Sequence, residues 1–144
     1  METFEFDIQE MVNILKNEYD ENYARCYGVA KTIEREDSEI FNVKEIDSSS
    51  DVYDLIDEIA HKAKDLYNNF DFLVFATAGW ASPIDNGNDT PPSQRTDRRR
   101  VYLFNVVSKQ KEIGSALVFQ DDFENQLIDV GSASGILMDA LLEL

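Results

Sequence analysis

The sequence predicts an α+β fold in which helices pack on a small antiparallel meander sheet of about three strands. Two segments early in the chain carry apolar residues three and four positions apart, which is the spacing of one helix face. Three later segments, residues 70–78, 100–107 and 113–120, are apolar runs typical of buried strands. The chain has 144 residues, 43% of them hydrophobic, and is expected to form one domain, residues 1–144.

The first predicted helix covers residues 7–33, with Asp7 as its capping residue. Its apolar positions form one stripe: Ile8, Met11, Val12, Leu15, Tyr19, Tyr23, Cys26, Val29, Ala30 and Ile33. Residues 40–43 fit either a short strand or a tucked loop. The hydroxyl and carboxylate groups of residues 48–51 predict the cap of a second helix, which we expect to end near Asn68.

The predicted strands follow this second helix. Residues 72–76 are apolar at every position, as expected of a strand that is covered on both faces. The next two strands flank a short polar connection and predict a hairpin, so the middle strand of the meander is the second one. Residues 121–124 predict an acidic turn that ends the sheet, and residues 131–135 predict a small-residue link to a C-terminal helix.

The chain is strongly acidic, with 29 Asp and Glu residues against 13 Lys and Arg and a formal net charge of −16. Such a surface repels free nucleic acid and anionic membranes, so neither is an expected direct partner. The charge can serve solubility alone, or it can attract a basic partner or mimic a nucleic-acid backbone. The mimic would use carboxylates of the second helix, namely Asp51, Asp54, Asp57, Glu58 and Asp65.

Composition also bears on the compartment. No basic and apolar leader begins the sequence and no apolar run is long enough to cross a membrane, so we expect neither a signal peptide nor a membrane span. The single cysteine excludes an intramolecular disulfide and fits a reducing environment. We therefore expect a cytoplasmic protein.

Residues that usually carry catalysis are few. His61 is the one histidine and has no evident nucleophile or orienting partner, while Cys26 falls on the apolar stripe of the first predicted helix. One histidine and one cysteine do not supply a zinc site of the usual type. Asp121 and Asp122 leave open a hydrolase with a carboxylate-bound Mg²⁺ ion. The sequence favours a protein without catalytic residues, metal or cofactor.

The strongest signal for binding lies between the first two predicted strands. This segment contains the only tryptophan, all three prolines and the densest group of arginines in the chain. Strand alternation directs Arg98 and Arg100 to one face and Arg99 to the other. The predicted partner-binding residues are Trp80, Ser82, Ser93, Gln94, Arg95, Arg98, Arg99 and Arg100. The structural alternative is that the arginines pair with helix carboxylates and that Trp80 completes the core.

A resemblance supports treating this segment as a unit. Residues 72–83 read Phe-Leu-Val-Phe-Ala-Thr-Ala-Gly-Trp-Ala-Ser-Pro, and residues 92–101 read Pro-Ser-Gln-Arg-Thr-Asp-Arg-Arg-Arg-Val. In this the chain resembles a group of small uncharacterised proteins from actinobacteria and their phages, which share a Gly-Trp-Ala-x-Pro strand end and an Arg-Arg-Arg-Val strand start. The resemblance covers residues 70–120. The group has no assigned activity, so it implies no catalytic residue.

Together these features predict a small, acidic, non-enzymatic binding protein that recognises a protein or a small anion through the segment from Trp80 to Arg100. Two alternatives stay open: an acidic, phage-type inhibitor or nucleic-acid mimic, and a metal-dependent hydrolase that uses carboxylates. The identity of the partner and the oligomeric state are not predicted.

Overall fold

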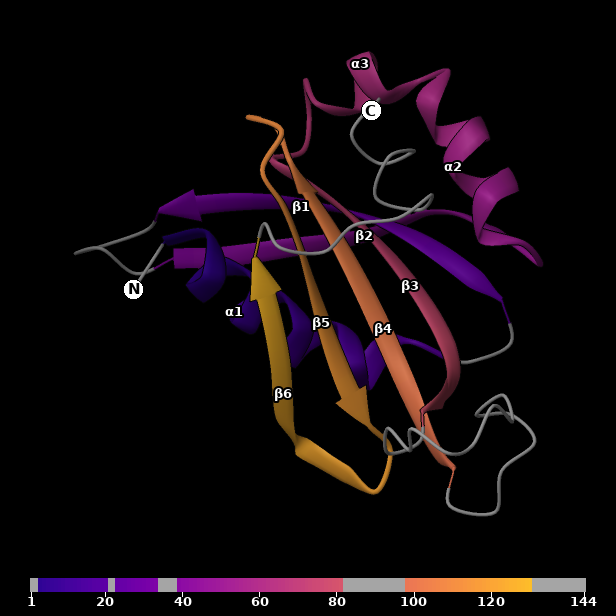
Figure 1. Cartoon of the computed structure of the whole chain (residues 1–144). Helices are drawn as coiled ribbons and strands as arrows, with labels where there is room; N and C mark the ends of the chain where they lie inside the picture. Colours follow the sequence, from indigo (N-terminus) through magenta and orange to yellow (C-terminus); the bar gives the residue numbers. More distant parts are fainter. Residues whose placement is uncertain (1–2, 21–22, 34–38, 82–97, 131–144) are drawn as a thin grey trace.

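A six-stranded antiparallel sheet dominates the computed structural model, which describes residues 3–20, 23–33, 39–81 and 98–130 (Figure 1). The strand order is β2-β1-β3-β4-β5-β6. The strands are β1 (Ala24–Ile33), β2 (Glu39–Ser49), β3 (Phe72–Ala81), β4 (Arg99–Ser108), β5 (Ile113–Phe119) and β6 (Asp122–Val130), and the helices are α1 (Thr3–Glu18), α2 (Val52–Ala60) and α3 (Ala63–Leu66). The predicted α+β fold with a three-stranded meander is therefore wrong, because the protein is mostly β.

The helix predicted over residues 7–33 is wrong in its second half. α1 ends at Glu18, and β1 then begins at Ala24. β1 is buried on both faces, with Cys26 in one core and Val29 in the other, so its apolar residues show no strand alternation. Their spacing continued the helical stripe by coincidence. Asp7 is likewise not a cap: it lies inside α1 and is buried.

The two edge strands account for the other missed part of the sheet. Residues 40–43 belong to the long strand β2, which pairs with β1 along its whole length. Residues 121–124 do not end the sheet, because β6 begins at Asp122 and pairs antiparallel with β5. Edge strands are half in solvent and carry many polar residues, so neither segment shows the apolar run that marks a buried strand.

The second predicted helix is confirmed at its beginning and divided further on. Asp51 caps α2, since its Oδ1 atom accepts hydrogen bonds from the backbone N–H groups of Tyr53 at 2.7 Å and Asp54 at 3.4 Å. α2 ends at Ala60, where the exposed His61 forms the C-cap. A turn then leads to the short helix α3, so one predicted helix is two.

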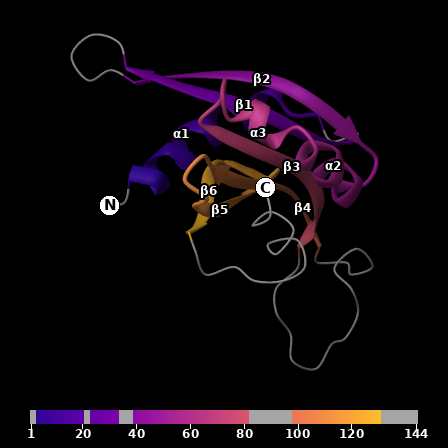
Figure 2. The same ribbon diagram turned by 90° about the horizontal axis from the view of Figure 1, so that it is seen from above.

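Helices cover both faces of the sheet (Figure 2). α1 packs on one face through residues at helical spacing, including the fully buried Ile8, Met11 and Leu15, against Val74 and Phe104 of the central strands. α2 and α3 pack on the opposite face; the core there consists of Ala24, Cys26, Leu55, Ile56, Ile59, Ala63, Tyr67, Leu73, Phe75 and Val107. The central strands are thus buried on both faces, as the apolar run at residues 72–76 predicts.

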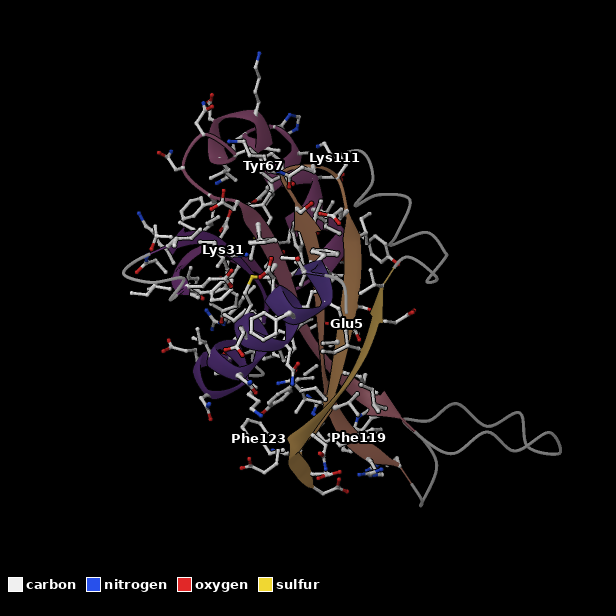
Figure 3. All side chains as sticks on the ribbon, turned by 90° about the vertical axis from the view of Figure 1, so that its left-hand side faces the viewer. Glu5, Lys31, Tyr67, Lys111, Phe119 and Phe123 are labelled. Atoms are coloured by element: carbon white, nitrogen blue, oxygen red, sulfur yellow. The ribbon has the colours of Figure 1, made fainter. Side chains whose placement is uncertain are left out.

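The middle of the sheet agrees with the predicted meander, because β4 pairs with β3 on one side and β5 on the other. Its two ends differ in character (Figure 3). At one end, the ammonium group of Lys111 lies 5.0 Å from the centre of the Tyr67 ring. At the other end lie Phe119, Phe123 and the last residues of β3. The predicted link at residues 131–135 and the C-terminal helix lie outside the described residues.

Candidate functional site

The end of β3 brings Trp80 together with two of the four predicted arginines, Arg98 and Arg100. Trp80 pairs directly with Arg100 across the β3–β4 ladder. The guanidinium carbon of Arg98 lies 4.4 Å from the centre of the Trp80 ring, and that of Arg100 lies 5.0 Å from it. These distances are those of cation–π contacts. The tryptophan ring is thus held against two cations at the surface of the sheet.

Arg99 lies on the opposite face, as strand alternation predicts. Its guanidinium carbon is 3.8 Å from the centre of the Phe119 ring. Its Nε atom donates to both carboxylate oxygens of Asp121, at 3.1 and 3.0 Å. This hydrogen bonding holds the pKa of Asp121 below its usual value. Arg99 therefore braces the β5–β6 turn, and its partner is a turn carboxylate rather than a helix carboxylate.

Trp80 does not complete the core. Its side chain is 39% exposed, a high value for the largest apolar residue in the chain. Two further aromatic residues, Tyr23 and Tyr53, are 51% and 46% exposed. Tyr23 and Tyr53 lie beside Thr77 and Ala78, and Trp80, Arg98 and Arg100 lie at the next residues of β3 and the beginning of β4; we call these five residues together the β3-end surface.

A hollow of about 400 Å³ lies beside the same stretch of β3. Three tyrosines form much of its wall, and the N-terminus of α2 closes one side. Its lining residues are Tyr19, Tyr23, Ala24, Ser50, Asp51, Val52, Tyr53, Thr77 and Ala78. We call it the tyrosine hollow; Trp80 follows its last lining residue by two positions on β3.

Local contacts fix the walls of this hollow. Tyr19 packs edge-to-face against Tyr102, with ring centres 5.3 Å apart, and its hydroxyl donates to the backbone oxygen of Tyr23 at 2.8 Å. Burial raises the pKa of Tyr19 to about 12, so this hydroxyl keeps its proton at neutral pH. The cap made by Asp51 sets the first turn of α2 and hence the position of Tyr53.

Four of the predicted binding residues lie outside the described residues: Ser82, Ser93, Gln94 and Arg95. Sequence reasoning missed Tyr19, Tyr23 and Tyr53 as a group. The predicted helical stripe includes Tyr19 and Tyr23, whereas Tyr19 directly follows α1 and Tyr23 directly precedes β1. The available signal was the position of Tyr53, an exposed aromatic residue two places after a helix cap.

The residues considered for catalysis do not line the tyrosine hollow. Cys26 is completely buried on β1, and this burial raises the pKa of its thiol far above the usual range. Asp121 is paired with Arg99, and Asp122 accepts a hydrogen bond from the side-chain amide of Asn125 at 3.0 Å. Among the residues that the structure describes, no group of three or more His, Cys, Asp and Glu side chains could hold a metal ion. On the described residues, no observation favours the hydrolase.

The acidic residues of α2 form a separate surface. Asp54, Asp57 and Glu58 are exposed, as is Asp65 on α3. A shared hydrogen bond with Asp47 raises the pKa of Glu58, because two carboxyl groups that lie together disfavour double ionisation. Lys62 lies 3.8 Å from Asp47 and compensates part of this charge. Asp51, in contrast, faces the tyrosine hollow.

Comparison of the chain with protein-family models, curated proteins and solved structures gave no match. Within the described ranges, no helix has the length and apolar character needed to cross a membrane.

Proposed function

We propose that the protein is a non-enzymatic binding protein that recognises a protein partner through the β3-end surface. One observation carries the proposal: the exposed Trp80 ring is held against the guanidinium groups of Arg98 and Arg100. Tryptophan, tyrosine and arginine are the residue types that dominate the binding energy of protein interfaces. A partner that covers this surface would bury rings that already have a fixed position, at a low cost in side-chain entropy.

The arginines also suit this role. A guanidinium group stacked on an aromatic ring adds a flat cationic area to the surface, and Arg100 is further held by a hydrogen bond from its Nη1 atom to the backbone oxygen of Gly79 at 3.5 Å. A small anion would be attracted by the same charges, but it would leave the aromatic area of Tyr23, Tyr53 and Trp80 uncovered. The combination therefore favours a protein over a small anion. The buried free cysteine Cys26 is compatible with our further proposal that the protein acts in the cytoplasm.

Affinity capture with matched arginine variants tests the proposal. The full chain is immobilised, proteins from the source cells are captured, and the retained proteins are quantified by mass spectrometry. We expect Trp80→Ala and the double variant Arg98→Ala with Arg100→Ala to lose at least one protein that the wild type retains. Arg99→Ala removes the same type of side chain from the opposite face and should retain that protein. If all variants retain the same proteins, the β3-end surface is not the recognition surface.

The acidic inhibitor is a second candidate, favoured by the exposed carboxylates Asp54, Asp57 and Glu58 on one helix. Such an inhibitor would bind a basic, nucleic-acid-binding protein, and its affinity would fall steeply with salt. Replacing the three residues by Asn, Asn and Gln would abolish capture in this case, while Trp80→Ala would leave it unchanged. The two proposals thus predict opposite results for the same pair of variants.

A further inference from the structure

Over the residues that the structure describes, the β1-facing edge of β3 has no strand partner at the β3-end surface. On the β4 side, pairing extends through Ala81, which lies opposite Arg99. On the β1 side, pairing ends at Ala76, which lies opposite Arg25. No described strand pairs with residues 77–81 on this side. Exposed strand edges present N–H and C=O groups that accept an added strand.

The tyrosine hollow opens at this unpaired edge, because Thr77 and Ala78 line it. Its volume of about 400 Å³ is enough for a long side chain and lies in the range of ligand pockets. Alternate residues of an added strand point to the same side, so a strand along residues 77–81 can place a side chain in the hollow. The edge would supply backbone hydrogen bonds to the added strand, and the hollow would determine which side chain the strand carries.

The chemistry of the hollow selects for a positive charge. Among its described lining residues, Asp51 carries the one carboxyl side chain, and Tyr19, Tyr23 and Tyr53 also line the space. Tyrosine rings attract cations through their faces. The nearby Arg25 is occupied, since it forms ion pairs with Asp20 at 2.8 Å and with Glu45. The net charge of −16 adds a long-range attraction for a basic partner.

We propose that the partner contributes an extended basic segment that pairs with residues 77–81 of β3 and inserts a lysine or arginine side chain into the tyrosine hollow. This inference rests on the proposed function and names the kind of segment that the β3-end surface recognises. The backbone of the segment continues the sheet beyond the beginning of β1, and its basic side chain lies against Asp51 and the tyrosine rings.

Selection from a phage-displayed random peptide library on the full chain gives the first test. We expect the selected peptides to share a lysine or arginine flanked by β-branched or aromatic residues. One selected peptide is then synthesised with fluorescein, and its affinity is measured by fluorescence anisotropy. Exchange of its basic residue for glutamate should abolish binding. Selection of acidic peptides, or of no peptide, would overturn the inference.

Backbone methylation distinguishes strand addition from side-chain binding. In an extended peptide, the N–H groups of alternate residues point to the same edge. N-methylation of the odd-numbered residues therefore blocks one edge of the peptide, and N-methylation of the even-numbered residues blocks the other. We expect one pattern to weaken binding by about tenfold or more, because it removes the inter-strand hydrogen bonds, and the other to have little effect. Equal affinities for the two patterns and the parent peptide would show that no strand is added.

Two variants test the hollow without disturbing the fold. Asp51→Asn keeps the helix cap, since asparagine caps as well as aspartate, but removes the charge. We expect it to weaken peptide binding, whereas Asp54→Asn, the same change at an exposed site that does not line the hollow, should not. Tyr53→Ala should weaken binding about tenfold through loss of a cation–π contact, with Phe6→Ala on α1 as the exposed aromatic control.

Failure of this inference is distinguishable from failure of the proposed function. If Trp80→Ala loses a captured protein while Asp51→Asn and Tyr53→Ala retain it fully, the β3-end surface binds a protein and the hollow takes no basic side chain. If selected peptides depend on Asp51 but no protein is lost by Trp80→Ala, the hollow binds basic segments and the proposed role of Trp80 is wrong.

Discussion

Lys31 connects three elements through its ammonium group. It extends from β1 and bonds to both carboxylate oxygens of Asp7 on α1, at 3.0 and 3.2 Å, and lies 3.2 Å from Glu39 on β2. Burial raises the pKa of Asp7 by more than the Lys31 hydrogen bond lowers it, so the net pKa lies above its ordinary value. The folded carboxyl group therefore holds its proton to a higher pH than the unfolded one, and its contribution to stability is lost as pH rises.

Replacing Lys31 by Met should therefore destabilise the protein in a pH-dependent way. Without its cation, the buried Asp7 carboxylate loses its compensation, at a cost of about 1–3 kcal/mol near neutral pH. At acidic pH the carboxyl group is protonated in both variant and wild type, and the difference should shrink. Urea denaturation across this pH range measures the effect, and Lys44→Met, at an exposed lysine on β2, is the control. A difference that does not depend on pH would contradict this role for Lys31.

Cys26 should be inert in the folded protein. It is completely buried between β1 and the α2 layer, and its raised pKa keeps the sulfur protonated and non-nucleophilic. We expect no reaction with iodoacetamide under native conditions and full alkylation in denaturant, measured by mass spectrometry. Fast alkylation of the folded chain would contradict the burial of this thiol.

Close packing requires glycine at two strand positions, Gly28 on β1 and Gly114 on β5, where an added Cβ atom would meet a neighbouring side chain. A Cβ atom at Gly28 on β1 would lie 2.7 Å from ring atoms of Phe70, whereas one at Gly79 on β3 would meet no atom within 4 Å. We expect Gly28→Ala to destabilise the protein by about 1–3 kcal/mol, since the half-buried Phe70 ring must shift to make room for the added methyl group. Gly79→Ala, also in a strand, should change stability by less than about 0.5 kcal/mol. Equal losses in thermal denaturation would contradict this packing.

Which elements could be predicted from the sequence depends on where each lies in the sheet. The buried strands β3, β4 and β5 and the cap of α2 have strong local signals, namely apolar runs and Asp51. β1 has an ambiguous signal because it is buried on both faces, and the edge strands β2 and β6 are too polar to show one. At the site, side-chain alternation along β4 predicts that Arg98 and Arg100 lie on one face of the sheet and Arg99 on the other. The tyrosine hollow is lined by residues just after α1, at the beginning of β1, at the beginning of α2 and on β3, and no local pattern contains this arrangement.

At the scale of the whole molecule, charge and recognition surface act at different distances. The net charge of −16 attracts a basic partner over about one Debye length, whereas the β3-end surface makes the short-range contacts. For a selected basic peptide, we expect added salt to lower the association rate constant strongly and the dissociation rate constant little. Stopped-flow anisotropy at increasing NaCl concentration measures both. An association rate that does not depend on salt would contradict electrostatic attraction.

Amide hydrogen exchange of the full chain, with and without a selected peptide, tests the central claim most directly. If the β3-end surface is the recognition surface, exchange should slow at residues 77–81 and 50–53, where the added strand and its basic side chain lie. It should not change on β6, at the far edge of the sheet. Slowing at residues 54–58 of α2, with none on β3, would contradict the claim and would instead favour recognition through the acidic helix face.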